Sequence, residues 1–393
     1  MKTKLAILSM AGLLATPAMA DIQINGFANL VGGMTLDDDE SLYGYDSDFN
    51  FDPASVFGLQ VRGEVSDKLS ATAQVVGRGR DDYSADFEWA YLTYMVNNNI
   101  SVSAGRLRLP LFKYSASLDV GYAYHWITPP NAVYGIDYNN LDGVRIDYQN
   151  FAGDWEYGAQ LTVGRTEEET VIGGTPADLE VKNIVTLSVE LTRDWFSARS
   201  LVGTGKVSAT NDDFDNFIDG FSQLNAVVNG AARAADQLSV NEDSGSFFEI
   251  AMDVDKYDWF VGAEYTRVEV EDSIIATNDA WYVTAGMRFG KFTPHITYEV
   301  EEGDISDRVG YLSGLPSTID SGSAAIDGTW ATVLQTAQGL VAQQKNEVSA
   351  VTLGLRYDLE PGFALKTDVT WFSDDLNDLN DATLLRVAAN YTF

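Results

Sequence analysis

The chain has 393 residues, and its 58 acidic side chains outnumber 25 Lys and Arg, for a formal net charge of −33. The lack of cysteine excludes disulfides and thiolate metal sites, and the acidity argues against a nucleic-acid partner. With 45% hydrophobic residues, 12% aromatic residues and only 9 prolines, the composition argues against a disordered chain.

The first twenty residues have the pattern of a secretory signal peptide. Lys2 and Lys4 form a basic region, Leu5 to Leu14 is apolar, and Ala18-Met19-Ala20 resembles a cleavage site. The apolar run is too short for a transmembrane anchor, because a membrane helix needs ~20 apolar residues. We therefore expect residues 1–20 to be a signal peptide and residues 21–393 to form one domain.

From Ile22 onward, hydrophobic and polar residues alternate in segments that are joined by connections of unequal length. This period of two predicts strands with one apolar and one polar face. The predicted strands are 22–30, 57–65, 69–78, 87–96, 100–104, 144–148, 155–163, 183–191, 196–207, 248–254, 259–268, 281–289, 292–300, 351–357, 363–371 and 384–393. Their number, about 16, is even, as in porin-sized membrane barrels.

Two features favour a membrane barrel over a soluble β-sandwich. Nearly every strand has a register whose apolar face carries no charge, as a lipid-facing surface requires. Aromatic residues also gather near the short turns, where an interfacial girdle belongs; they are Trp155, Trp259, Phe292, Phe363 and Phe393. We therefore predict an all-β, membrane-spanning antiparallel barrel with short periplasmic turns and long outer loops.

One connection, from Gly105 to Asn140, is unusually long and aromatic. Between Leu109 and Ile136 its only charged residues are Lys113 and Asp119. A loop this apolar needs a surface to pack on, and the inside of the barrel is the available one. We predict that this loop folds into the lumen.

Most of the acidic residues fall in the other long loops, at 37–40, 167–169, 212–219, 301–307 and 373–381. They form either a solvated surface or sites for divalent cations that bridge to lipopolysaccharide. Two of these loops also carry apolar residues at helical spacing, around Phe217 and around Leu334. We expect loop helices that pack on the barrel mouth and narrow or cap its entrance.

The last strand places Leu385, Val387, Ala389, Tyr391 and Phe393 on one face and ends on that phenylalanine. This ending resembles the closing strand of Gram-negative outer-membrane barrels, whose terminal Phe is read by the barrel-assembly machinery. The resemblance implies that Tyr391 and Phe393 act as an assembly signal.

The whole pattern resembles the general porin superfamily of trimeric, roughly 16-stranded outer-membrane channels. In those proteins the third outer loop follows the fifth strand and folds into the lumen, and the long loop here follows the fifth predicted strand. The resemblance covers residues 21–393 and includes the Gly105-Arg106 step into the loop. It implies a homotrimer in the outer membrane of a Gram-negative bacterium, in contact with membrane lipids and lipopolysaccharide.

A basic wall is expected opposite the long loop. Strand parity turns Arg62, Arg78, Arg145 and Arg386 inward, whereas Arg106 has lipid-facing parity unless the chain bends at Gly105. The porin resemblance implies that it does bend. Facing this wall, the constriction loop carries five candidate residues: Arg108, Lys113, Asp119, Tyr122 and Tyr124.

Two interpretations of the arginines stay open. They set up a transverse field against Asp119, since rows of charge select ions in pores, or they pair within the wall. The wall carboxylates available for such pairs are Glu64, Glu88, Asp147 and Glu190.

The sequence offers no catalytic or cofactor-binding pattern. Its two histidines, His125 and His295, have no ligand cluster or nucleophile motif beside them, so we expect neither an enzyme, a cofactor nor a metal site. The predicted function is a water-filled channel for passive diffusion of small hydrophilic solutes and ions. A substrate-specific channel is the alternative, followed by an adhesin or structural barrel.

Overall fold

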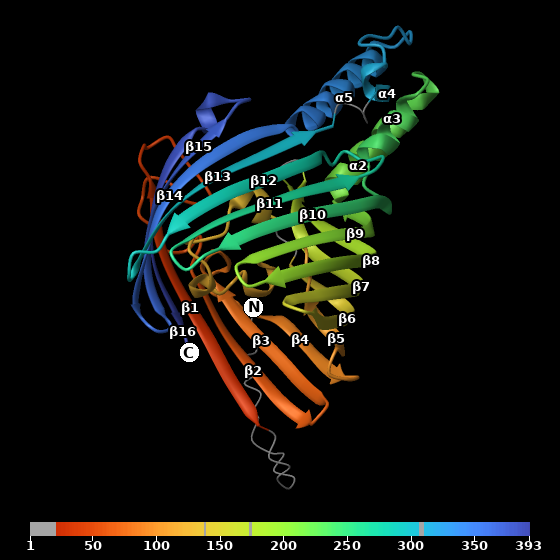
Figure 1. Ribbon diagram of the computed structural model, residues 1–393. Helices are drawn as coiled ribbons and strands as arrows, with labels where there is room; N and C mark the ends of the chain where they lie inside the picture. Colours follow the sequence, from red (N-terminus) through yellow and green to blue (C-terminus); the bar gives the residue numbers. More distant parts are fainter. Residues whose placement is uncertain (1–20, 137–138, 173–174, 306–309) are drawn as a thin grey trace, which may run out of the picture.

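A computed structural model describes residues 21–136, 139–172, 175–305 and 310–393 of the chain. The expected signal peptide, residues 1–20, lies outside the described residues. Sixteen antiparallel strands of the described chain close into a barrel, in which β1 pairs with both β2 and β16 (Figure 1). The predicted fold class and strand number are confirmed.

All strands except β3 are longer than the alternation predicted, because several continue into the outer loops. They are β1 (Ile22–Thr35), β2 (Val56–Ser66), β3 (Leu69–Arg78), β4 (Ala85–Met95), β5 (Ile100–Arg108), β6 (Asn140–Ala152), β7 (Trp155–Ile172), β8 (Thr175–Arg193), β9 (Phe196–Thr210), β10 (Asp243–Asp255), β11 (Trp259–Val270), β12 (Thr277–Met287), β13 (Phe292–Asp304), β14 (Asn346–Glu360), β15 (Phe363–Asp374) and β16 (Ala382–Thr392).

The two faces of the wall differ as lipid and water require. Apolar side chains such as Ile24, Leu59 and Ile146 are exposed on the outside, whereas polar ones such as Thr72 and Ser188 are buried on the inside. A closed barrel also leaves no strand edge without backbone partners, which is what the hydrocarbon region demands. The wall is therefore a membrane-spanning surface.

The barrel closes at its short-turn end through Phe393. Its backbone exchanges two hydrogen bonds with Gly26, of 2.9 and 3.0 Å. Its ring lies over Gly26, where an added Cβ would stand only 2.3 Å from the ring. Phe393 remains 60% exposed, and Trp259 and Phe292, near neighbouring short turns, are 41% and 48% exposed. These are positions suited to an interfacial girdle.

Two outer loops build helices, as the apolar spacing predicted. The β9–β10 loop contains α2 (Asp212–Gln223), the 3₁₀ helix η4 (Leu224–Ala226) and α3 (Ala231–Leu238), and the β13–β14 loop contains α4 (Gly310–Ser313) and α5 (Ala324–Gln343). Short 3₁₀ helices η1 (Gly79–Asp81) and η5 (Asp378–Asn380) occur in two further loops. No helix in the described ranges combines the length and apolarity needed to cross a membrane.

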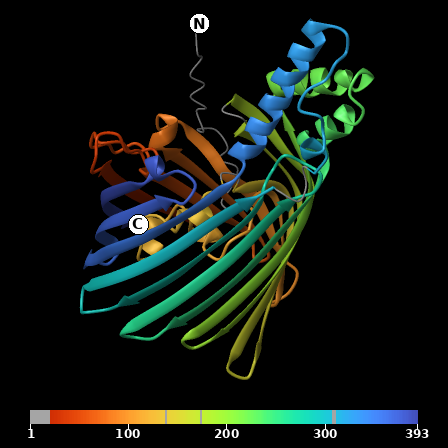
Figure 2. The same ribbon diagram turned by 90° about the horizontal axis from the view of Figure 1, so that it is seen from above.

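The prediction that these helices cap the entrance is wrong. They project beyond the rim on the side of β9 to β14 (Figures 1 and 2). The reason is that their apolar faces pack on one another, with Phe221 and Trp330 rings 5.9 Å apart, and on rim residues such as Val207 and Val270.

The described residues of the β5–β6 connection, 109–136 and 139, lie inside the ring of strands (Figure 2). We call this connection the inner loop; its residues 137–138 lie outside the described part. It contains η2 (Ser115–Ser117), η3 (Gly121–Ala123) and the short helix α1 (Asn131–Tyr134). The loop begins later than predicted, because β5 ends at Arg108 rather than at Ala104.

Three glycines in register mark where β5 and its neighbours bend. Gly105 pairs with Gly143, which pairs with Gly164. A Cβ at these positions would stand 2.1 to 2.5 Å from a backbone oxygen of an adjacent strand. Gly105 also has φ of 137°, a conformation that side chains disfavour. The bend expected at Gly105 is therefore present.

Candidate functional site

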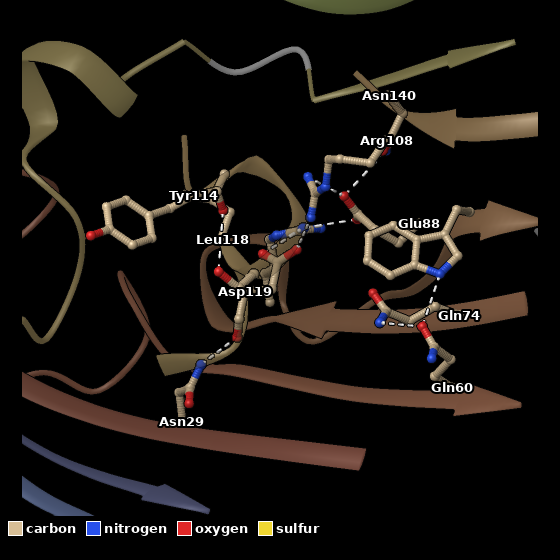
Figure 3. Close-up of polar contacts among 12 residues, drawn as sticks. Asn29, Gln60, Gln74, Glu88, Arg108, Tyr114, Leu118, Asp119 and Asn140 are labelled. Carbon is tan, nitrogen blue, oxygen red and sulfur yellow. Dashed lines mark hydrogen bonds and ion pairs between the residues drawn. The ribbon is translucent and has the colours of Figure 1, made fainter. Parts of the chain in front are cut away.

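The inner loop is tied to the β3–β5 wall by a cluster of four charged side chains, which we call the latch: Arg78, Glu88, Arg108 and Asp119 (Figure 3). Arg78 donates to Glu88 at 2.8 Å and to Asp119 at 3.0 Å. Arg108 pairs with Glu88 at 2.9 Å and also donates to Asp119. The two positive and two negative charges balance.

The latch is shielded from water and supported by wall side chains. Burial alone would raise the pKa of Asp119, but the Arg108 and Arg78 guanidiniums outweigh it and hold that pKa below its usual value. Asp119 is therefore ionised at neutral pH. The Arg108 guanidinium lies over the Trp89 ring, 5.1 Å from its centroid, and the Trp89 indole donates to Gln60 at 3.2 Å.

This geometry corrects two predictions. Arg108 belongs to the wall rather than to the constriction loop, because β5 continues past Gly105. Asp119 also does not face the arginines across an open gap; it bonds two of them directly. Opposite charges in direct contact largely cancel at a distance, so this carboxylate and its two partners contribute little to a field across the lumen.

Arg62 does not join the latch. It faces Thr72 on β3, six residues before Arg78, which corresponds to about 20 Å along the strand. Its side chain is exposed near the short-turn end of the lumen. The prediction that Arg62 lies opposite Asp119 is therefore wrong, because parity fixes the face of a strand and not the height along it.

Neither Arg106 nor Arg145 bonds Asp119. Arg106 lies between Ala90 and Asp142 in the strand register, and its guanidinium pairs with Asp142 at 3.2 Å. Arg145 pairs with Asp147 at 3.0 Å and lies 5.9 Å from the Tyr91 ring centroid. Both keep partly exposed side chains.

Arg386 contacts the inner loop from β16, which is separated from β4 by three strands around the barrel. It forms a bidentate pair with Asp368, at 3.0 and 2.8 Å, and donates to Thr128 of the loop at 2.8 Å. Both members of the ion pair are buried, so the contact orients the loop and contributes no free charge to the lumen.

The remaining predicted loop residues are spread around the wall. Lys113 reaches β9 and β10, where it pairs with Asp253 and donates to Ser197 at 3.2 Å. The Tyr122 ring lies under the Arg356 guanidinium, at 4.7 Å, and the Tyr124 hydroxyl donates to the Leu118 carbonyl at 2.9 Å. Their aromatic bodies therefore pack the loop.

The sequence interpretation missed the wall residues that hold the inner loop most directly. Glu264 accepts from the Lys113 amide at 3.0 Å and the Tyr134 hydroxyl, and Glu299 accepts from the Ala132 amide at 2.9 Å. Arg356 and Lys366 donate to loop carbonyls. Parity turns these side chains inward, but a backbone amide or carbonyl partner leaves no signal in a sequence.

The two histidines of the chain come together in the lumen. The rings of His125 and His295 lie 4.7 Å apart, and His125 contacts the Thr284 hydroxyl at 3.0 Å. Burial, reinforced by the nearby His295 and Lys366, holds the pKa of His125 well below 6.5. Among the described residues, no group of three or more His, Asp or Glu side chains has an arrangement suited to a metal ion.

Two cavities lie along the inner loop. The outer cavity, about 670 Å³, is lined by residues of the first outer loop such as Tyr43, by Arg78 and Arg386 of the wall, and by Trp126. The inner cavity, about 440 Å³, reaches the short-turn end and is lined by Tyr122, His125 and Arg288 among others. Tyr124 lines both cavities.

No protein-family model matches the sequence, and no curated protein matches it significantly. Solved structures do match its fold. The outer membrane channel DcaP of Acinetobacter baumannii is 13% identical with a TM-score of 0.55, over 96% of this chain and 99% of the other. An anion-selective porin from Comamonas acidovorans is 14% identical with a TM-score of 0.54, over 95% and 100%.

The chain has a porin-type, 16-stranded barrel fold. A third match, the trimer form of OmpT, an outer membrane protein of Vibrio cholerae, is 13% identical with a TM-score of 0.54, over 95% and 99%. The predicted resemblance is thereby confirmed at the level of the fold. The porin-type barrel matches Gram-negative outer-membrane proteins, as the alternation and the terminal strand predicted.

Proposed function

We propose that this chain forms a water-filled channel in the outer membrane of a Gram-negative bacterium, through which small hydrophilic solutes and ions diffuse passively. The observation that carries the proposal is the uneven burial of the lumen wall. Under the inner loop, wall residues such as Glu264, Thr297 and Asp368 are buried. On β6, Arg145 and Asp147 keep side-chain exposures of 21% and 32%. The accessible polar wall offers a wet path beside the loop.

Charge on this path is mixed, which favours a general channel. Arg145 and Asp147 pair with each other, and Arg106 pairs with Asp142. Pairs of opposite sign present polar groups to a passing solute without a large net field. We therefore propose weak discrimination between solutes of similar size and no catalysed reaction.

A substrate-specific channel is the second candidate, and the outer cavity favours it. Its volume of about 670 Å³ lies within the range of small-molecule sites, and polar groups of Asn29, Asn50 and Arg386 converge on it. A solute that binds in this cavity would be transported even at a low external concentration, and related solutes would compete with it for the cavity.

The proposal extends to export and assembly. Residues 1–20 would direct secretion, Tyr391 and Phe393 would be recognised by the assembly machinery, and the barrels would associate as homotrimers in contact with lipopolysaccharide. The trimer form of OmpT supports the oligomeric part, because it has the same fold. Crosslinking in mild detergent should capture a trimer, whereas monomer alone would overturn this part.

Liposome swelling tests the function. Vesicles that contain the folded protein should swell in isotonic solutions of small sugars, at rates that fall smoothly with solute size. Addition of a second sugar should leave each rate unchanged if diffusion is general, whereas saturation and competition would support the specific channel. Swelling no faster than that of protein-free vesicles would overturn both candidates.

A further inference from the structure

One segment of the inner loop, residues 119–126, makes most of its backbone hydrogen bonds with side chains of the barrel wall, while the Val120 and Ala123 amides bond loop carbonyls. We call it the tip segment. Its Asp119 carbonyl accepts from Asn29 at 2.6 Å, and its Gly121 amide donates to the same side chain at 3.2 Å. Buried backbone groups require partners, and irregular structure cannot supply enough of its own. The conformation of the tip segment therefore depends on the wall.

Lys366, on β15, provides most of these partners. Its ammonium donates to the carbonyls of Gly121 at 2.6 Å, Tyr124 at 2.9 Å and Trp126 at 2.5 Å. An ammonium has three N–H donors, so these three carbonyls account for all of them. Lys366 is buried, and none of the ion pairs in the described part of the chain involves it. Its charge is thus directed at the loop backbone.

Arg356, on the adjacent strand β14, completes the arrangement. It donates to the carbonyls of Tyr122 at 2.8 Å and Tyr124 at 2.7 Å, while its other nitrogens bond Asp358. Together with Asn29, the two cations engage five carbonyls within eight residues of the tip segment. We call Lys366 and Arg356 the clamp.

The clamped segment lies where the two cavities meet. Asp119 and Trp126 line the outer cavity, Tyr122 and Ala123 line the inner cavity, and Tyr124 lines both. A segment that is fixed here forms a partition across the β14–β16 half of the lumen. The partly exposed charged residues Arg145 and Asp147 lie in the other half, on β6.

We infer that Lys366 and Arg356 are positioning residues that keep the tip segment closed against β14–β16 and so confine solutes to the half of the lumen lined by β6. This inference rests on the proposed channel function for its second part only. Its first part, that the clamp holds the tip segment, concerns the loop alone and is tested without any transport measurement.

The first experiment measures the mobility of the tip segment. The chain has no cysteine, so Ala123→Cys, at an exposed position, provides a single site for a nitroxide spin label. In folded protein with the native clamp, the label should give an immobilised spectrum. Lys366→Met should convert it to a mobile one, because the buried carbonyls of Gly121, Tyr124 and Trp126 each lose one donor.

Lys291→Met is the matched control. Lys291 also donates to a backbone carbonyl, that of Leu359 at 2.6 Å, but in a short turn outside the inner loop. It should leave the spectrum at Ala123 unchanged. An immobile label in folded Lys366→Met protein would overturn the inference that the clamp holds the tip segment. If Lys366→Met fails to fold, Arg356→Gln, which removes only two of the contacts, should still increase mobility, and an unchanged spectrum there would overturn the clamp too.

The second experiment uses single-channel conductance to test whether solutes are confined to one half of the lumen. Lys366→Met should raise single-channel conductance and open-channel noise in planar bilayers, because the partition no longer separates the two cavities. Lys366→Cys protein, aminoethylated while unfolded and then refolded, should regain the native values, since this modification restores an ammonium at the same position. Unchanged conductance with a mobile label would overturn the confinement of solutes. A native protein that fails to conduct would instead overturn the proposed function and leave the label result standing.

Discussion

The inner loop and the two helical loops solve the same problem in different ways. Each is a long irregular connection that must satisfy its backbone and cover its apolar side chains. The helical loops do so largely among themselves: α2, α3 and α5 bond their own backbones and share a core around Phe221, Leu238 and Trp330 that rests on the barrel rim. The inner loop has only short helical turns, and its partners are wall residues such as Glu264, Lys366 and Arg386.

The two kinds of loop therefore differ in how strongly their conformation depends on side chains of the barrel wall. A unit with its own core tolerates changes in the barrel, whereas a loop held by the wall changes its shape when wall side chains change. Only the second arrangement links the conformation of a loop to the diameter of the lumen. Substitutions in the wall should therefore alter transport by changing the conformation of the inner loop.

Two buried tryptophans offer the sharpest test of this comparison. Trp126 and Trp330 are both almost fully buried, and each indole donates one hydrogen bond of 2.8 Å, to Thr297 and to the Pro316 carbonyl respectively. Replacement by Ala should cost each region ~3–5 kcal/mol of local stability. We expect Trp126→Ala to change conductance and Trp330→Ala to leave it unchanged while exposing α5 to proteolysis. Altered conductance in Trp330→Ala would show that the helical loops are coupled to the lumen.

A smaller effect is expected from pH. Because its arginine partners lower the pKa of Asp119, the ionised latch contributes stability above the ordinary carboxyl pKa of about 4. That stability is lost as the pH falls through the lower folded pKa. Open-channel noise should therefore stay constant between about pH 5 and 8 and rise only below about pH 4.

Asp119→Asn should raise the noise already at neutral pH and remove this acid transition. Asp142→Asn, which disrupts an exposed ion pair with Arg106, is the matched control and should keep the native profile. A noise transition near neutral pH in the native protein would show that another group, and not the latch, controls the inner loop.

The smallest effect is expected from Arg62. Because it lies about 20 Å from Arg78 along the wall, Arg62→Ala should shift the reversal potential in a salt gradient only slightly toward cations. Arg78→Ala should shift it more, since Glu88 and Asp119 would then share Arg108 alone. The measurement belongs in about 1 M salt, where the Debye length is ~3 Å and distant loop carboxylates are screened. Equal shifts would place both arginines at the constriction.

Much of the fold could be predicted because the barrel depends on a local pattern. The period of two in segments such as Leu385 to Phe393 fixes which side chains face lipid, and lipid forces the strands to close. The long aromatic connection after β5 was predicted to enter the lumen for the same reason, since its residues could not face water. Parity also turned Arg78, Arg145 and Arg386 toward the lumen.

The candidate site was predicted less well, because its parts meet only in three dimensions. Parity does not fix height, so Arg62 was placed beside Arg78 although the register separates them. The end of β5 could not be predicted from alternation, because the strand continues to Arg108 through Gly105, whose φ of 137° leaves no signal in the pattern. Lys366 had the correct parity, but nothing in the sequence distinguishes a lysine that faces water from one that binds carbonyls.

The sequence by itself determined the barrel, its sixteen strands and the presence of a loop within it, because the bilayer imposes one rule on every strand independently. Only the tertiary structure decided which charges are paired and where the loop is held. Those contacts join residues such as Asp119 and Arg78, or Lys366 and Tyr124, through the closure of the whole ring. Their energies depend on distance and burial, which no local pattern encodes.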